Sequence, residues 1–333
     1  MRFFLEATLV AALAASTSSA LWTSEKAGPA QLIREEGSVD TMGSVTAIVA
    51  YGEDAARLRT AIADALAEAT RLDAMLSNYK PQSEWSRVNR LAAHQAVPVS
   101  HELFQLLAAC LDYSRESEGT FDISVGPLMK VWGFYKGSGH LAERSRVFEA
   151  LDSVGYRNII LDPQQLTIRF AKEGVELDPG GIAKGYAVDR MVDVLRSEGV
   201  RIALVSVGGS SIYALGAPPH EKGWKIELKD PKQPANTIQN VNLRDESLST
   251  SGSYERFFYA DGKVWSHIMD PRTGYPSEGM LSVSVVAPKT IDSEAWAKPY
   301  YILGKQWTEH HKEKGFRVFV CEDKPATSCS WVE

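Results

Sequence analysis

The stretch LDPGGIAKGYAVDR, Leu177 to Arg190, places paired glycines in front of a segment with helical spacing. Glycines at a helix start let backbone N–H groups approach an anion, and the helix dipole favours negative charge there. Lys184 adds a mobile positive charge, and Asp178 could accept a hydrogen bond from a ribose or a base. The patterns GxxxxGK[ST] and GxGxxG are both missing from it. The stretch therefore predicts either an anion-binding helix start or a tight turn that packs a helix against a sheet.

The segments around this stretch mix helices with paired strands. Apolar spacing and capping residues predict helices at 54–77, 100–119, 181–197 and 293–303. Short β-branched or apolar runs predict strands at 44–51, 159–161, 166–170, 201–207, 224–228, 257–260, 281–287 and 316–321. The strands group into hairpins instead of alternating strictly with helices, which favours an α+β fold over a doubly wound sheet.

Two expectations concern where elements begin and end. Residues 21–40 are largely polar without clear periodicity, so we expect an extended lead-in there and a folded domain over 41–333. Pro299 should disturb the last helix near its start, because proline lacks the N–H and clashes with the preceding turn.

Composition and the N-terminus restrict the function classes. The chain has 333 residues and a net charge of −6, which gives no basic surface for nucleic acid, so we exclude that partner. Residues 1–20, MRFFLEATLVAALAASTSSA, are typical of a secretory signal peptide, and an ordinary N-terminal helix is the alternative. The apolar run is too short to span a bilayer, and no cysteine follows it. We therefore expect an exported, periplasmic protein without a cysteine-linked lipid anchor.

The three cysteines fall into two groups. Cys110 lies on the apolar face of an expected helix and is predicted to be a core thiol. Cys321 and Cys329 could form a small disulfide loop in an oxidising compartment. No Cys/His spacing indicates a zinc site.

Two further stretches admit a structural or a functional interpretation. Asp122, in GTFDISVGPLMKVWGF (119–134), precedes a Gly-Pro turn, and a lone aspartate there is more often a turn cap than a catalyst. The strand at 201–207 ends in Gly208-Gly209, which suits close backbone approach by a ligand or a plain strand end.

His267, in SHIMDPRTGYP (266–276), is the strongest candidate for a general base, because the unperturbed pKa of histidine lies near neutral. A structural histidine held by Asp270 is the alternative. Glu294 and Lys298 lie four residues apart, so on a helix they share a face. A surface ion pair is the alternative for these two residues.

Taken together and in order, the motifs MGS, LSNYKPQSEWSRVN, FDISVGP…WGF, DPGGIAKGYAVD, VGGS, TSGSY and HIMDPRTGYP resemble the ApbE family, the FAD:protein FMN transferases. The similarity runs from about Met42 to Gly304. It implies an ApbE-like α+β fold, related to the tunnelling-type arrangement of antiparallel strands with packed helices. Members of the family are exported enzymes that split FAD at its pyrophosphate, transfer FMN to a threonine or serine hydroxyl of a flavoprotein, and leave AMP. A divalent cation, usually Mg²⁺, lies against the pyrophosphate.

The resemblance also assigns roles to individual positions. His267 would be the base that removes the proton from the acceptor hydroxyl. The flavin and adenosine pockets would be lined by Met42, Tyr79, Thr120, Phe121, Asp122, Asp178, Lys184 and Ile268. The backbone carbonyl of Gly181 would be one metal ligand. The family normally adds an aspartate and, four residues later, a threonine as metal ligands, where this chain has Glu294 and Lys298.

The departure at Glu294 and Lys298 leaves three functional hypotheses. A glutamate can still bind a metal, but a charged lysine cannot, so we expect weaker metal dependence than is usual for the family. The first hypothesis is FMN transfer from FAD to an exported or membrane-bound flavoprotein of respiratory or electron-transfer type. The second is hydrolysis of FAD to FMN and AMP, which some members of the family carry out. The third is a non-catalytic exported protein that binds FAD.

Overall fold

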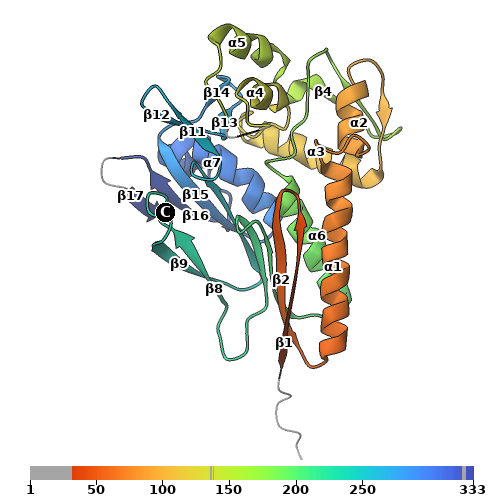
Figure 1. Ribbon diagram of the computed structural model, residues 1–333, viewed down its shortest axis with the longest axis vertical. Helices are drawn as coiled ribbons and strands as arrows, with labels where there is room; N and C mark the ends of the chain where they lie inside the picture. The colour runs from red at the N-terminus through yellow and green to blue at the C-terminus, as the bar shows by residue number, and fades with distance from the viewer. Residues whose placement is uncertain (1–31, 136, 138, 325–327) are drawn as a thin grey trace, which may run out of the picture. The chain divides into compact units, whose positions relative to one another are not determined.

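The computed structural model describes residues 32–135, 137, 139–324 and 328–333. Its largest element is a sheet formed by the strands β1 (Ile33–Thr41), β2 (Ser44–Gly52), β6 (Ile202–Val207), β7 (Ser211–Leu215), β10 (Glu246–Gly252), β15 (Met280–Ala287), β16 (Arg317–Glu322) and β17 (Ser328–Trp331). The order across this sheet is β1-β2-β6-β7-β10-β15-β16-β17 (Figure 1). Every neighbouring pair is antiparallel, so the sheet is built from hairpins and longer antiparallel returns.

Three long helices pack on one face of the sheet, namely α1 (Ala55–Leu76), α6 (Ala183–Ser197) and α7 (Thr290–His311). Helix α1 contacts β1 and β2, α6 contacts β6 and β7, and α7 contacts β10 and β15 (Figure 1). Asp54 caps α1, because its carboxylate accepts hydrogen bonds from the backbone N–H groups of Ala56 (2.9 Å) and Arg57 (3.1 Å). The apolar stripes of the helices are therefore buried against alternate residues of the strands.

A second hairpin protects part of the opposite face of the sheet. Its strands are β8 (Trp224–Lys229) and β9 (Thr237–Leu243). Trp224 and Leu228 pack with Leu248 of β10 and Phe319 of β16 in one buried cluster. Burial on both faces explains why β10 and β15 are apolar or small at almost every position.

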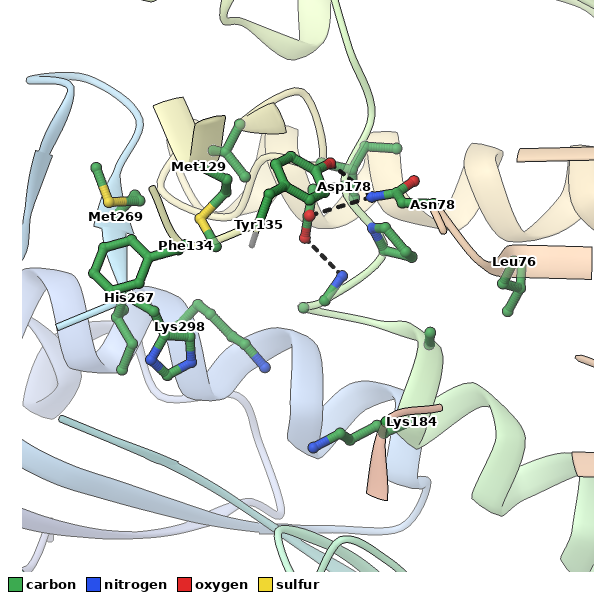
Figure 2. A pocket seen from close by; sticks show the side chains of 18 of the residues that line it. Leu76, Asn78, Met129, Phe134, Tyr135, Asp178, Lys184, His267, Met269 and Lys298 are labelled. Atoms are coloured by element: carbon green, nitrogen blue, oxygen red, sulfur yellow. Dashed lines mark hydrogen bonds between the residues drawn. The ribbon is translucent and has the colours of Figure 1, made fainter. Parts of the chain in front are cut away.

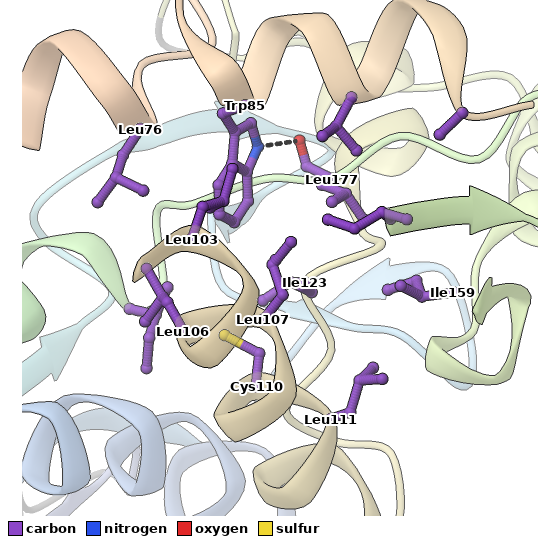
Figure 3. Packing of buried hydrophobic residues seen from close by; sticks show 14 of the residues in the cluster. Leu76, Trp85, Leu103, Leu106, Leu107, Cys110, Leu111, Ile123, Ile159 and Leu177 are labelled. Carbon is purple, nitrogen blue, oxygen red and sulfur yellow. Dashed lines mark hydrogen bonds between the residues drawn. The ribbon is translucent and has the colours of Figure 1, made fainter. Parts of the chain in front are cut away.

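A separate core lies beyond the end of α1 (Figure 3). It is formed by α2 (Glu84–Leu91), α3 (His101–Glu116) and a small sheet in the order β3 (Val97–Pro98), β5 (Thr167–Phe170), β4 (Ile159–Asp162). Ser100 is the N-cap of α3, and its hydroxyl accepts from the Leu103 N–H at 3.3 Å. Cys110 is fully buried in this core, as predicted. The Trp85 indole N–H donates to the Leu177 carbonyl at 3.0 Å, which fixes this core to the glycine-rich stretch.

The remaining elements surround an aromatic cluster that includes Trp132, Phe258 and Trp265. They are α4 (Gly126–Val131), α5 (Arg144–Ser153), β11 (Phe257–Ala260), β12 (Lys263–Ser266), β13 (Met269–Asp270) and β14 (Tyr275–Pro276). The 3₁₀ turn η1 (Tyr156–Asn158) instead packs through Tyr156 against the core of α2 and α3. The Trp132 and Trp265 rings stack with centroids 5.3 Å apart. In the described part of the chain, no helix has the length and apolar character needed to cross a membrane.

The α+β prediction is confirmed, and two of the predicted boundaries are wrong. Residues 33–40 are not a lead-in, because they form β1, which pairs with β2 across the two-residue turn Met42-Gly43. β1 is an edge strand, and an edge strand tolerates the polar residues that concealed it in the sequence. The last helix continues through Pro299 and is interrupted at Gly304 (φ 79°) instead. Cys321 and Cys329 are joined by a disulfide between β16 and β17. The signal peptide predicted at 1–20 lies outside the described residues.

Candidate active site

A cavity of about 460 Å³ is lined by side chains from several distant parts of the chain, some of which Figure 2 shows. The β1–β2 turn, the C-terminal end of α1, the glycine-rich stretch and α7 all contribute to its wall. Its lining includes nearly all the residues that the sequence singled out: Met42, Tyr79, Thr120, Phe121, Asp122, Asp178, Gly181, Lys184, His267, Ile268 and Lys298. Glu294 is the exception among the described residues. The tertiary structure therefore brings together side chains that lie more than two hundred positions apart in the sequence.

The segment that leads into the paired glycines is held rigidly at Leu177, which is fully buried. Asn89 of α2 binds both backbone groups of Leu177. The Asn89 Oδ1 accepts from the Leu177 N–H (2.8 Å), and the Asn89 Nδ2 donates to the Leu177 carbonyl oxygen (2.9 Å). Trp85 provides the second donor to that carbonyl. These bonds fix the position of Asp178, the next residue, at the cavity wall.

Asp178 organises the polar wall of the cavity (Figure 2). Its Oδ1 accepts from the Gly180 N–H (2.8 Å), and its Oδ2 accepts from the Asn78 amide (3.3 Å). The same amide nitrogen donates to the Tyr135 hydroxyl at 2.7 Å. Burial raises the pKa of Asp178 above its usual value, and the hydrogen bond from Gly180 opposes that shift.

Asp122 lines the cavity but acts first as a turn cap, as its place in the sequence indicated. Its Oδ1 accepts from the N–H and the hydroxyl of Ser124 (2.8 and 2.7 Å), and its Oδ2 accepts from the Tyr156 N–H (2.6 Å). Burial raises its pKa, and these hydrogen bonds lower it. Both carboxylate oxygens are thus occupied by the protein itself.

Helices α6 and α7 cap each other at the edge of the cavity. Asp189 of α6 accepts from the N–H groups of Thr290 (2.7 Å) and Ile291 (2.9 Å), which begin α7. In return, the Glu294 Oε2 accepts from the Gly185 N–H in the first turn of α6. Glu294 is buried and does not reach the cavity wall, so its carboxylate serves the helix start rather than the cavity.

Lys298 does reach the cavity, one helical turn further along α7. Its Nζ donates to the Glu294 carbonyl oxygen at 3.0 Å and lies 3.8 Å from the Glu294 Oε1. The side chain is 22% exposed, so the alternative of a surface ion pair is wrong. Burial lowers the pKa of Lys298, while the carboxylates of Glu294 and Glu255 oppose that shift.

His267 lies beside Lys298 at the opposite wall (Figure 2). Its Nδ1 is 3.3 Å from the Arg256 carbonyl oxygen, which can only accept, so Nδ1 carries the proton and Nε2 keeps a free lone pair. Burial lowers its pKa to about 4, and the positive charge of Arg256 contributes to the shift. Asp270 does not hold this histidine. Its carboxylate instead accepts two hydrogen bonds from the Arg272 guanidinium (3.0 and 2.9 Å) and one from the Arg272 backbone N–H (2.9 Å).

Comparison with known proteins gives the family. The ApbE family matches residues 42–320 of this sequence. The chain belongs to the ApbE family. A Klebsiella pneumoniae (strain 342) protein named FAD:protein FMN transferase is 35% identical over 239 residues, which cover 70% of this chain and 72% of the relative. A Salmonella typhimurium (strain LT2) protein of the same name is 29% identical over 304 residues, which cover 88% and 85%.

Solved ApbE structures have the same fold. The ApbE protein of Thermotoga maritima superimposes with a TM-score of 0.83 at 28% identity, covering 90% of this chain and 97% of that one. The apo form of the flavinyl transferase ApbE of Pseudomonas stutzeri gives a TM-score of 0.81 at 28% identity, covering 91% and 96%. The family and the fold predicted from the ordered motifs are thereby confirmed.

Several residues of this ApbE cavity were missed by the sequence reasoning. Asn78, Tyr135, Glu255 and Arg256 line it, and Asn89 supports it from outside. Each lies inside or next to a quoted motif, so motif membership was a usable signal. Their roles depend on partners distant in the sequence, and a motif does not disclose those partners.

The ApbE resemblance implies a divalent cation, and the residues present do not fit one. Glu294, at the position of the usual aspartate, is bound to the Gly185 N–H and lies away from the cavity wall. Lys298, at the position of the usual threonine, brings an ammonium group where a ligand oxygen is needed. Within the described ranges, no group of three or more His, Cys, Asp or Glu side chains could hold a metal ion. Only the Gly181 position of the expected ligand set is retained.

Proposed function

We propose that this chain is an FAD:protein FMN transferase that moves FMN from FAD to a serine or threonine hydroxyl of a flavoprotein and releases AMP. His267 carries the proposal, because a neutral imidazole with a free Nε2 lines the same cavity as Lys184 and Lys298. The relatives named for this activity support it. A cavity of about 460 Å³ is also within the range of small-molecule sites.

The chemistry requires one bond to form and one to break. The acceptor hydroxyl oxygen attacks the FMN phosphorus, and the bond from that phosphorus to the bridging oxygen breaks. The bridging oxygen leaves with AMP and keeps the electron pair, while the hydroxyl proton passes to the His267 Nε2. Negative charge on the phosphates is balanced by Lys184, at the start of α6, and by Lys298.

The lowered pKa keeps His267 neutral, and it also makes the Nε2 a weaker base than an ordinary imidazole. With a pKa of about 4, the imidazole is neutral across the physiological range and its Nε2 is free to act as a base. The hydrogen bond from Nδ1 to the Arg256 carbonyl oxygen holds the required tautomer. Water at the place of the hydroxyl would instead give hydrolysis of FAD to FMN and AMP.

The acceptor is proposed to be an exported or membrane-bound flavoprotein of respiratory or electron-transfer type. Export is supported by the signal-like residues 1–20 and by the Cys321–Cys329 disulfide, because disulfides persist in oxidising compartments.

The test combines the purified protein, FAD and a flavoprotein domain that carries a flavinylation serine or threonine. We expect covalent flavin fluorescence in a denaturing gel together with AMP release. His267→Gln should lose both products and still bind FAD, whereas His101→Gln, which alters an exposed histidine away from the cavity, should keep full activity. AMP release without labelled acceptor would support the hydrolase instead. Bound FAD that stays intact would overturn both catalytic proposals.

A further inference from the structure

The cavity contains an ammonium group that the fold holds in place. Lys298 donates to the Glu294 carbonyl oxygen of its own helix (3.0 Å), so its Nζ keeps two further N–H groups for other acceptors. The stem of Lys298 lies against the paired glycines, because a Cβ at Gly181 would be 3.6 Å from the Lys298 Cε. The lysine side chain is thus packed beside Gly181, whose backbone carbonyl would be a metal ligand according to the family resemblance.

Lys184 brings a second ammonium group to the same part of the cavity. Its Nζ lies 3.4 Å from the Ser210 hydroxyl and 3.3 Å from where a Cβ at Gly208 would be. Figure 2 shows the two lysine side chains extending toward each other from α6 and α7. The charge of Lys184 acts on Lys298 and on His267, so the three groups share one electrostatic environment.

The carboxylates of Glu294 and Glu255 favour the charged form of Lys298, and in the described part of the chain they belong to no group of side chains that could hold a metal ion. The Glu294 Oε2 accepts from the Gly185 N–H, its Oε1 lies 3.8 Å from the Lys298 Nζ, and Glu255 lies near both lysines. The Lys298 Cε lies 3.6 Å from where a Cβ at Gly181 would be, so a divalent cation beside Gly181 would be repelled by the ammonium group at the end of that side chain.

We propose that Lys298, acting with Lys184, neutralises the FAD pyrophosphate in this chain and that FAD binding here needs no divalent cation. The inference rests on the proposed function, which supplies the substrate. Each phosphate of the pyrophosphate has a negative charge, and each lysine offers a matching positive charge with N–H donors. When the bridging oxygen leaves with AMP, the same donors stabilise the charge that develops on it.

The test measures FAD binding, so it does not depend on turnover. The full protein is treated with EDTA, and the Kd for FAD is measured by flavin fluorescence before and after Mg²⁺ is added. We expect the wild-type Kd to change by less than about twofold. Lys298→Thr should weaken binding in EDTA by roughly 10- to 100-fold, which is the loss of a charge-assisted hydrogen bond. Glu294→Asp combined with Lys298→Thr restores the usual ligand types, and its binding should become dependent on Mg²⁺.

A matched control lies on the same helix. Lys305 is also paired with a glutamate four residues away, Glu309 at 3.9 Å, but lies outside the cavity. Lys305→Thr should keep the wild-type Kd in EDTA and with Mg²⁺. Wild-type binding that is about tenfold or more weaker in EDTA, or Lys298→Thr binding as tightly as wild type in EDTA, would overturn this inference alone. Wild-type protein that binds no FAD under either condition would overturn the proposed function as well.

Discussion

Asn89→Ala tests whether the Asn89 side chain holds the glycine-rich stretch in place. The change removes the 2.8 Å bond from the Leu177 N–H and the 2.9 Å bond to the Leu177 carbonyl oxygen. The Leu177 carbonyl oxygen keeps Trp85 as a donor, so the loss of its bond from Asn89 should lower the free energy of unfolding by about 1 kcal/mol. The N–H has no other acceptor and is fully buried with Leu177, so leaving it unpaired should cost about 1–3 kcal/mol.

The two losses together predict that the free energy of unfolding falls by about 2–4 kcal/mol. Urea denaturation followed by circular dichroism measures this change. Asn158→Ala is the matched control, because Asn158 is equally half-buried but its amide contacts two carbonyl oxygens only at 3.5 Å. That control should cost less than about 1 kcal/mol, since hydrogen bonds of that length are weak.

A second measurement separates the position of the stretch from general stability. Asp178 and the glycines that follow it line the cavity, so Asn89→Ala should also weaken FAD binding at temperatures where the variant is folded. If Asn89→Ala destabilises no more than Asn158→Ala, the hydrogen bonds to Leu177 do not hold the stretch and the reasoning is refuted.

Two further predictions follow from the helix pair and from His267. Gly185→Ala would place a Cβ 2.5 Å from the Thr290 carbonyl oxygen, so α6 and α7 must separate. The free energy of unfolding measured by urea denaturation should therefore fall by at least about 2 kcal/mol. An unchanged urea midpoint would contradict this packing of α6 against α7. His267 has a folded pKa of about 4, below the 6.5 of the unfolded chain, so its contribution to stability is present above pH 6.5 and is lost as the pH falls toward 4. The acid limb of the pH profile of kcat/KM for FAD should accordingly lie near pH 4. Between pH 7 and pH 4, wild type should lose more free energy of unfolding than His267→Gln. An acid limb near pH 6.5 would be inconsistent with the lowered pKa of His267.

Local patterns were sufficient for the helices α1, α3, α6 and α7 and for about half of the strands, whereas α2, α4, α5 and the central strand β10 were not predicted. Asp54 and Ser100 were readable as helix starts because an N-cap side chain binds the backbone two or three residues ahead of it. Strand β1 was not readable, because its pairing with β2 and its place at the sheet edge are relations between strands. The position of the last helix break was also missed, since the chain tolerates Pro299 and turns at Gly304.

For the site, the sequence determined which residues meet, and only the tertiary structure decided what each of them does. The ordered motifs were enough to predict the family, and all the predicted site residues except Glu294 line the cavity. The spacing of Glu294 and Lys298 correctly placed both on one helix, but Lys298 faces the cavity while Glu294 caps α6. The neutral state of His267 likewise depends on burial and on Arg256. Spacing along a chain fixes which side chains share a face, whereas charge, protonation and ligand capacity depend on what that face meets.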